Sequence, residues 1–205
     1  MTKLRIYIAD VSSTDTKTFL SLYSTLPKEW REKIDGFTLT KDKYLSLFSG
    51  LLLERVKKDY KKENEEIVFN ENGKPYFISG DIYFNLSHSG EKVCCAVSDS
   101  EIGCDIQKIG EYKEKTVNGF FSPTEREYVL SSDDKTDAFY SVWTLKESYI
   151  KNLGESIIKA RNLSVITEKG VKVPEKTFYI CDVKGYKLAC CVSTEEEIET
   201  SFIYC

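Results

Sequence analysis

Two short segments of the chain resemble each other, and they lie almost half its length apart. Residues 93–98 (Val-Cys-Cys-Ala-Val-Ser) and 188–193 (Leu-Ala-Cys-Cys-Val-Ser) both have the composition of a short buried strand. Each of them follows a turn that contains a glycine. We therefore predict that the 205 residues form two related halves, 1–100 and 101–205, which pack as a pseudo-dimer.

The rest of the sequence alternates between strand and helix patterns. The spacing of apolar residues predicts long helices over residues 41–62 and 135–152, the second of which ends near Gly154. Short helices broken by Pro27 are expected between residues 16 and 34. Strands are predicted at 4–9, 66–69, 82–86, 92–98, 101–107, 161–166, 176–183, 186–193 and 197–204. This order predicts an α+β fold, in which each half has a mostly antiparallel sheet packed on helices.

Composition and charge exclude several classes of protein. The net charge of −4 argues against a nucleic-acid-binding protein, and no apolar run approaches the roughly 18 residues of a membrane span. The seven cysteines form no Cys-x-x-Cys pair and there is one histidine, so no structural zinc site is expected. An odd number of cysteines without an apolar N-terminal signal fits reduced thiols in the cytoplasm.

Residues 84–90, Phe-Asn-Leu-Ser-His-Ser-Gly, form the first of three polar motifs. We predict that a strand ends here and that a polar loop follows it. Hydroxyl, imidazole and backbone donors in such a loop can surround an anion. The alternative is a turn that is rich in local hydrogen bonds, and the residues alone leave both interpretations open.

The second motif, residues 102–107, places two polar side chains on one face of a strand. Asp105 and Gln107 are two positions apart and so point the same way, among apolar neighbours. A carboxylate on a buried face is costly unless it is paired, hydrogen-bonded or bound to a metal. An edge strand with a hydrated polar face is the alternative.

The third motif lies in the helix predicted over residues 135–152. Trp143, Glu147 and Lys151 fall on one helical face at a spacing of four, although an exposed ion pair would have the same pattern. Together with Asp105, Glu147 could supply oxygen ligands for a hard cation. Lys146 and Lys151 flank Glu147 and could neutralise phosphate groups.

Five motifs, in this order and at this spacing, resemble the phosphopantetheinyl transferase superfamily, in particular its larger single-chain (surfactin-type) class. The motifs are Gly73-Lys74-Pro75, residues 84–90, Gly103-Cys104-Asp105, Phe120-Phe121-Ser122 and Trp143-x-x-Lys146-Glu147-Ser148-x-x-Lys151. The resemblance implies an Mg²⁺-dependent enzyme that moves phosphopantetheine from coenzyme A to a serine of an apo acyl or peptidyl carrier protein. Adenosine 3′,5′-bisphosphate would be released. With two halves in one chain, a monomer is expected.

The resemblance also implies roles for individual residues. Asp105, Gln107 and Glu147 would bind Mg²⁺ together with the coenzyme A diphosphate. Glu147 would also be the base that activates the carrier serine, either directly or through a metal-bound water. Lys146 and Lys151 would neutralise the diphosphate, and Lys151 is counted with Glu147 as catalytic.

The coenzyme A nucleotide has its own implied contacts, which lie mainly in the first half. Ser87 and His88 would hold the ribose 3′-phosphate, and Lys33 and Ser46 fall where the family has further phosphate contacts. The turn Gly73-Lys74-Pro75 would border the adenine. The active site would therefore lie between the halves, with the metal and the catalytic residues in the second.

The chain departs from the family pattern at two positions. Gln107 stands where bacterial members usually have a second acid, which predicts weaker metal binding rather than loss of activity. Trp30 stands roughly where a basic residue is often seen, leaving Lys28 or Lys33 to compensate. Glu125 matches a family acid, but its place three residues after Ser122 explains it as a helix cap.

The sequence leaves two rival functions open. The first is a non-catalytic relative that binds coenzyme A or a carrier domain, for which the neutral Gln107 is the main support. The second is a metal-dependent hydrolase of nucleotide diphosphates, which would cleave coenzyme A without a carrier. No sequence feature identifies the carrier protein or its pathway.

Overall fold

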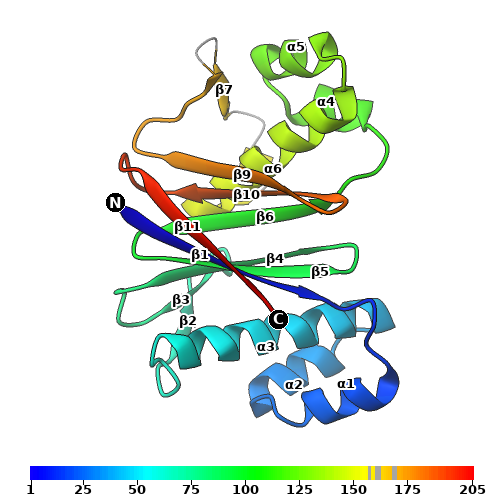
Figure 1. Cartoon of the computed structure of the whole chain (residues 1–205), viewed down its shortest axis with the longest axis vertical. Helices are drawn as coiled ribbons and strands as arrows, with labels where there is room; N and C mark the ends of the chain where they lie inside the picture. The colour runs from blue at the N-terminus through cyan, green and yellow to red at the C-terminus, as the bar shows by residue number, and fades with distance from the viewer. Residues whose placement is uncertain (157, 160–162, 168–169) are drawn as a thin grey trace.

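The computed structural model describes residues 1–156, 158–159, 163–167 and 170–205, and its layers run helices, sheet, sheet, helices (Figure 1). The first half contains β1 (Thr2–Asp10), α1 (Thr16–Tyr23), α2 (Lys28–Asp35), α3 (Thr40–Asp59), β2 (Ile67–Phe69), β3 (Pro75–Phe77), β4 (Tyr83–Ser89) and β5 (Lys92–Ser98). The second contains β6 (Ile102–Lys108), α4 (Glu114–Phe120), α5 (Pro123–Ser131), α6 (Lys135–Leu153), β7 (Ile166–Thr167), β8 (Gly170–Val171), β9 (Thr177–Val183), β10 (Tyr186–Val192) and β11 (Ile198–Tyr204).

The two halves repeat one arrangement of elements. Each has a strand, three helices, a short hairpin and a longer hairpin, and the strand orders β1-β5-β4 and β6-β10-β9 correspond. The similar segments 93–98 and 188–193 correspond to β5 and β10, which lie inside the two sheets. The predicted α+β pseudo-dimer is thereby confirmed.

The last strand, β11, returns to the first sheet and pairs in parallel with β1. Residues from the end of the chain thus complete the sheet of the first half, as Figure 1 shows. The boundaries 1–100 and 101–205 stay a prediction. Within the described residues, no helix has the length and apolar character needed to cross a membrane.

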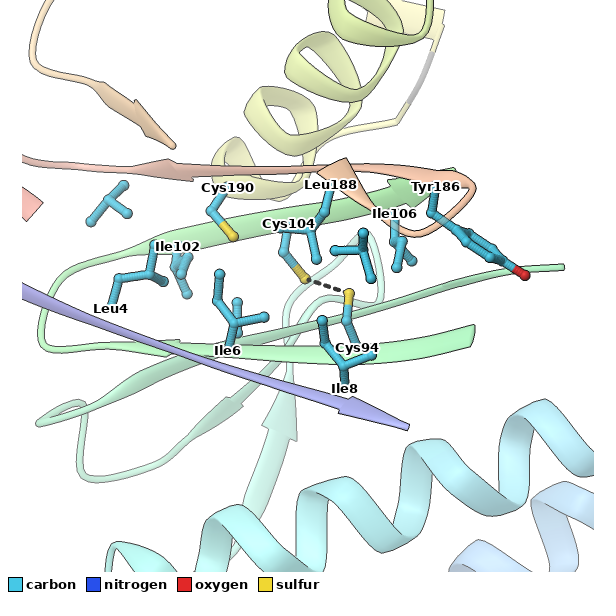
Figure 2. Close-up of a cluster of buried hydrophobic side chains, with 13 residues drawn as sticks. Leu4, Ile6, Ile8, Cys94, Ile102, Cys104, Ile106, Tyr186, Leu188 and Cys190 are labelled. Atoms are coloured by element: carbon cyan, nitrogen blue, oxygen red, sulfur yellow. Dashed lines mark hydrogen bonds between the residues drawn. The ribbon is translucent and has the colours of Figure 1, made fainter. Parts of the chain in front are cut away.

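The main core lies between the two sheets (Figure 2). Apolar side chains of β1 and β5 face those of β6 and β10, and the Sγ atoms of Cys94 and Cys104 lie 3.8 Å apart. The contact with Cys104, and next burial, raise the pKa of the Cys94 thiol well above its ordinary value. All seven cysteines are free, and five of them are buried. These five act as small apolar side chains of the core.

Side chains of β4 join the two sheets where β4 and β6 run next to each other. Alternate polar residues of β4 accept hydrogen bonds from backbone N–H groups of β6. The pairs are Asn85 with Cys104 (2.9 Å), Ser87 with Ile106 (3.3 Å) and Ser89 with Lys108 (3.0 Å). The prediction of a loop after residue 86 is therefore wrong, because β4 continues to Ser89 and its polar side chains satisfy the backbone of the neighbouring strand.

Helix α6 lies directly on β6 because Gly103 has no side chain. A Cβ atom there would stand 2.1 Å from the carbonyl oxygen of Ser148 and 2.2 Å from the amide nitrogen of Asn152. The helix begins with Asp134 as N-cap and ends at Gly154, whose φ of 65° is left-handed. Close packing at Gly103 is what brings the end of α6 to the side chains of β6.

We expect Gly103→Ala to destabilise the protein by about 1–3 kcal/mol, because backbone atoms of α6 cannot move aside as a flexible side chain can. Chemical denaturation would measure the loss. Gly119→Ala is the matched control, since nothing lies within 4 Å of a Cβ atom there and alanine favours the helix. Equal stability of the two variants would contradict this account of the packing.

Candidate active site

Asp105 is the centre of a polar cluster between β4, β6 and α6. Its side chain is 2% exposed. Its Oδ1 accepts hydrogen bonds from Ser87 Oγ at 2.8 Å and from Lys151 Nζ at 2.6 Å, and its Oδ2 accepts one from Gln107 Nε2 at 2.9 Å. Three donors thus offset the cost of burying this carboxylate. The hydrogen bond from Gln107 is possible because Asp105 and Gln107 lie on one face of the strand, as predicted.

Glu147 lies one helical turn before Lys151 and is partly buried. Burial, and next the charge of Asp105, raise the pKa of Glu147 to about 7, against the opposing effect of Lys151. Among the described residues, none donates a hydrogen bond to its carboxyl group. A carboxylate with a pKa near neutrality and no internal partner is suited to accept a proton at physiological pH.

Lys151 of α6 connects Ser87 of β4 with Asp105 of β6. Its Nζ donates to Ser87 Oγ at 2.9 Å as well as to Asp105. Burial opposes its charge, but Asp105 outweighs burial and the pKa of Lys151 is raised. Lys151 is therefore charged throughout the physiological range and is held by its partners at one position.

A separate pocket of about 220 Å³ lies between α2, α3 and β4. Lys33, Ser46 and His88 all line it, so the structure brings together three of the predicted phosphate contacts. The Ser46 hydroxyl is buried and has no hydrogen-bond partner among the described residues. Partial desolvation, and next the Lys151 ammonium, lower the pKa of His88. The imidazole is therefore harder to protonate than a free one.

Ser87 does not share that pocket with its neighbour His88. Adjacent side chains of a strand point to opposite faces, and Ser87 points to Asp105 and Lys151. The structure therefore groups Ser87 with the carboxylate cluster and His88 with the pocket.

The turn at Gly73 and Pro75 lies against the C-terminal end of α6. Lys74 Nζ donates to the carbonyl oxygen of Asn152 at 2.8 Å and forms an ion pair with Glu101 at 2.7 Å. This contact ties the first half to the helix that holds Glu147. The border of this turn with the adenine stays a prediction.

The structure places Lys146 away from the other residues for which a contact with the diphosphate is predicted. The Lys146 side chain is 1% exposed and its Nζ bonds to Glu125 Oε2 at 2.8 Å and to the carbonyl oxygen of Leu163. Consecutive residues of a helix point about 100° apart, so Lys146 turns away from the site although Glu147 faces it. It has a structural role in this arrangement.

Glu125 has a larger role than its position in the sequence indicates. The predicted capping box with Ser122 is present, but the Glu125 side chain is 0% exposed and also binds Lys146 and the backbone N–H of Val165. Spacing within the helix could reveal only the cap. The partners at 146 and 165 lie far along the chain and leave no local signal.

The donor groups around Asp105 are compatible with Mg²⁺ but not with a closed metal site. Among the residues that the structure describes, no three His, Cys, Asp or Glu side chains form a metal-binding group. Asp105 lies close enough to Glu147 for its charge to raise the pKa of Glu147. The side-chain amide of Gln107 lies beside Asp105 and could provide a further oxygen ligand. Mg²⁺ is commonly held by one or two carboxylates, with the remaining ligands from water and substrate phosphates.

Nearly the whole chain is similar to known proteins. Residues 13–100 match the family model "4′-phosphopantetheinyl transferase, N-terminal", and residues 101–197 match "4′-phosphopantetheinyl transferase superfamily". The 4′-phosphopantetheinyl transferase gsp of Aneurinibacillus migulanus is 33% identical over 200 residues, covering 91% of this chain and 84% of the relative. The 4′-phosphopantetheinyl transferase Sfp of Bacillus subtilis (strain 168) is 32% identical, covering 89% and 88%.

Proposed function

Because this chain belongs to the 4′-phosphopantetheinyl transferase superfamily, we propose that it moves the phosphopantetheine arm of coenzyme A onto a serine of an apo carrier protein. The observation that supports the chemistry best is the cluster of Asp105, Glu147 and Lys151. It combines a buried carboxylate, a carboxylate with a pKa near 7 and a fixed cation. The adjacent pocket at His88 would receive the ribose 3′-phosphate.

In the proposed reaction Glu147 takes the proton of the carrier serine hydroxyl. The serine oxygen attacks the β-phosphorus of the coenzyme A diphosphate and forms the new phosphoester bond. The bond from that phosphorus to the bridging oxygen breaks, and adenosine 3′,5′-bisphosphate leaves with the electron pair. The Lys151 ammonium offsets the negative charge that develops on the leaving phosphate.

We further propose that the reaction depends on Mg²⁺. Asp105, Glu147 and the Gln107 amide oxygen would hold the ion. When bound, Mg²⁺ would stabilise negative charge on the diphosphate oxygens. We also propose that the enzyme acts in the cytoplasm as a monomer, which the free buried cysteines and the two fused halves support.

Intact-mass spectrometry tests the function directly. Several apo carrier proteins would be incubated with this protein, coenzyme A and Mg²⁺, with EDTA and no-carrier controls. We expect a gain of the mass of phosphopantetheine on a carrier that EDTA prevents. Bound but intact coenzyme A with no modified carrier would favour the non-catalytic relative, and cleavage without a carrier would favour the hydrolase.

Gln107→Glu should strengthen binding of Mg²⁺, because it adds a negative charge beside Asp105. We expect the Mg²⁺ concentration for half-maximal transfer to fall on the order of ten-fold. Gln107→Met, which removes the amide but keeps the length, should raise it. Mn²⁺ binding followed by electron paramagnetic resonance provides a readout independent of turnover. Unchanged metal affinity in both variants would show that position 107 does not face the ion.

A further inference from the structure

We propose that Trp30 is a positioning residue for Lys33, whose ammonium it holds as the cation that receives a phosphate monoester in the pocket beside His88. This inference rests on the proposed function, since coenzyme A would supply the monoester as its ribose 3′-phosphate. It assigns a role to the tryptophan that stands roughly where a basic residue is often seen in the family.

The indole of Trp30 is held against α3 at two neighbouring points. Its Nε1 donates a hydrogen bond of 2.8 Å to the carbonyl oxygen of Ser46, in α3. Gly50 lies one turn further along α3, and a Cβ atom there would stand 2.4 Å from Trp30 Nε1. The ring therefore rests on the bare backbone of α3, and any larger residue at position 50 would displace it.

The fixed ring in turn holds Lys33. The Lys33 Nζ lies 4.6 Å from the centroid of the Trp30 ring, within the range of a cation–π interaction. The two residues are three apart on α2, so they lie on the same side of that helix. No carboxylate of the described residues forms an ion pair with Lys33. Its charge is thus oriented by an aromatic face and left available to an anion.

The other groups in the pocket fit a phosphate monoester. The buried Ser46 hydroxyl has no partner, and His88 can become charged when it meets an anion. The pocket also contains the carboxylate of Asp42, which would repel a phosphate. The position of the Lys33 ammonium is therefore important for binding, and Trp30 determines it.

The ligand pair that isolates this contact is adenosine 3′,5′-bisphosphate and adenosine 5′-monophosphate, which differ only in the 3′-phosphate. Calorimetric titration would measure both on the wild type, Trp30→Leu, Trp30→Phe and Lys33→Gln. We expect Trp30→Leu to weaken bisphosphate binding about two- to five-fold and to leave monophosphate binding unchanged. Trp30→Phe, which keeps an aromatic face, should retain more of the preference, and Lys33→Gln should lose most of it.

A parallel comparison of coenzyme A with 3′-dephospho-coenzyme A in the transfer assay adds a kinetic readout. Trp30→Leu should raise KM for coenzyme A with little change in kcat, and KM for the dephospho donor should stay constant. Equal losses for both members of a pair would assign Trp30 a merely structural role and overturn the proposal. If the wild type transfers to no carrier, the proposed function fails, whereas the calorimetric comparison still decides the role of Trp30.

Discussion

Glu147→Gln is expected to lower the rate of carrier modification by at least about 10²-fold, because the amide cannot take the proton of the serine hydroxyl. The substitution keeps the size of the side chain, so the surrounding packing is unchanged. Intact-mass spectrometry of a carrier at fixed coenzyme A and Mg²⁺ would measure the rate. Glu127→Gln, an exposed substitution on α5, is the control for nonspecific effects. Transfer by Glu147→Gln at the wild-type rate would exclude Glu147 as the base.

The same variant has a predictable effect on stability without metal. The pKa of Glu147 is raised from 4.5 to about 7 in the folded protein, chiefly by burial. The folded state therefore favours the protonated carboxyl group of Glu147. The stability that this group contributes is fully present below pH 4.5 and is lost as the pH rises through about 7. We expect the wild type to lose stability relative to Glu147→Gln over this interval in EDTA. A loss of activity in a variant that shows this pH difference cannot be attributed to misfolding.

Lys146→Met should destabilise the protein by about 3–5 kcal/mol, the largest effect on stability that we expect. The substitution leaves the carboxylate of Glu125 buried without its cation, and both side chains are at most 1% exposed. Burial lowers the pKa of Lys146, and the hydrogen bond and charge of Glu125 oppose this shift. Removing the ammonium from water therefore costs free energy, which the pairing with Glu125 offsets. Denaturant titration would measure the change.

Two further variants distinguish the structural role from contact with the diphosphate. Lys115→Met removes an exposed lysine of α4 and should leave stability nearly unchanged. The double variant Lys146→Met/Glu125→Gln should recover part of the lost stability, because it also removes the unpaired charge. A fully stable Lys146→Met with a raised KM for coenzyme A would instead support the role that the family resemblance implied.

Local features of the fold could be predicted because they depend on near neighbours in the chain. The capping box at Ser122 and the end of α6 at Gly154 need only residues within one turn. The strands β5 and β10 are recognisable from their continuous apolar composition, and their similarity was sufficient to predict two halves. The short helix α4 and the hairpin strand β3 were not predicted, since neither has a distinct apolar pattern.

Several predictions for the site depended on which face a residue occupies. Asp105 and Gln107 were placed correctly relative to each other, because alternation on a strand is a local property. A loop was predicted after residue 86, because no local pattern indicates that β6 lies beside these residues and needs acceptors for its N–H groups.

By itself, then, the sequence determined the two halves, most of their strands and helices, the resemblance to the family, and the candidate residues Asp105 and Glu147. Only the tertiary structure decided that Lys146 pairs with Glu125, that Ser87 joins Asp105 rather than His88, and that Trp30 rests on Gly50 beneath Lys33. The physical reason is common to all three. Each contact joins elements that are brought together by the packing of helices and sheets, and the energy of a buried charge or a fixed ring depends on those distant partners.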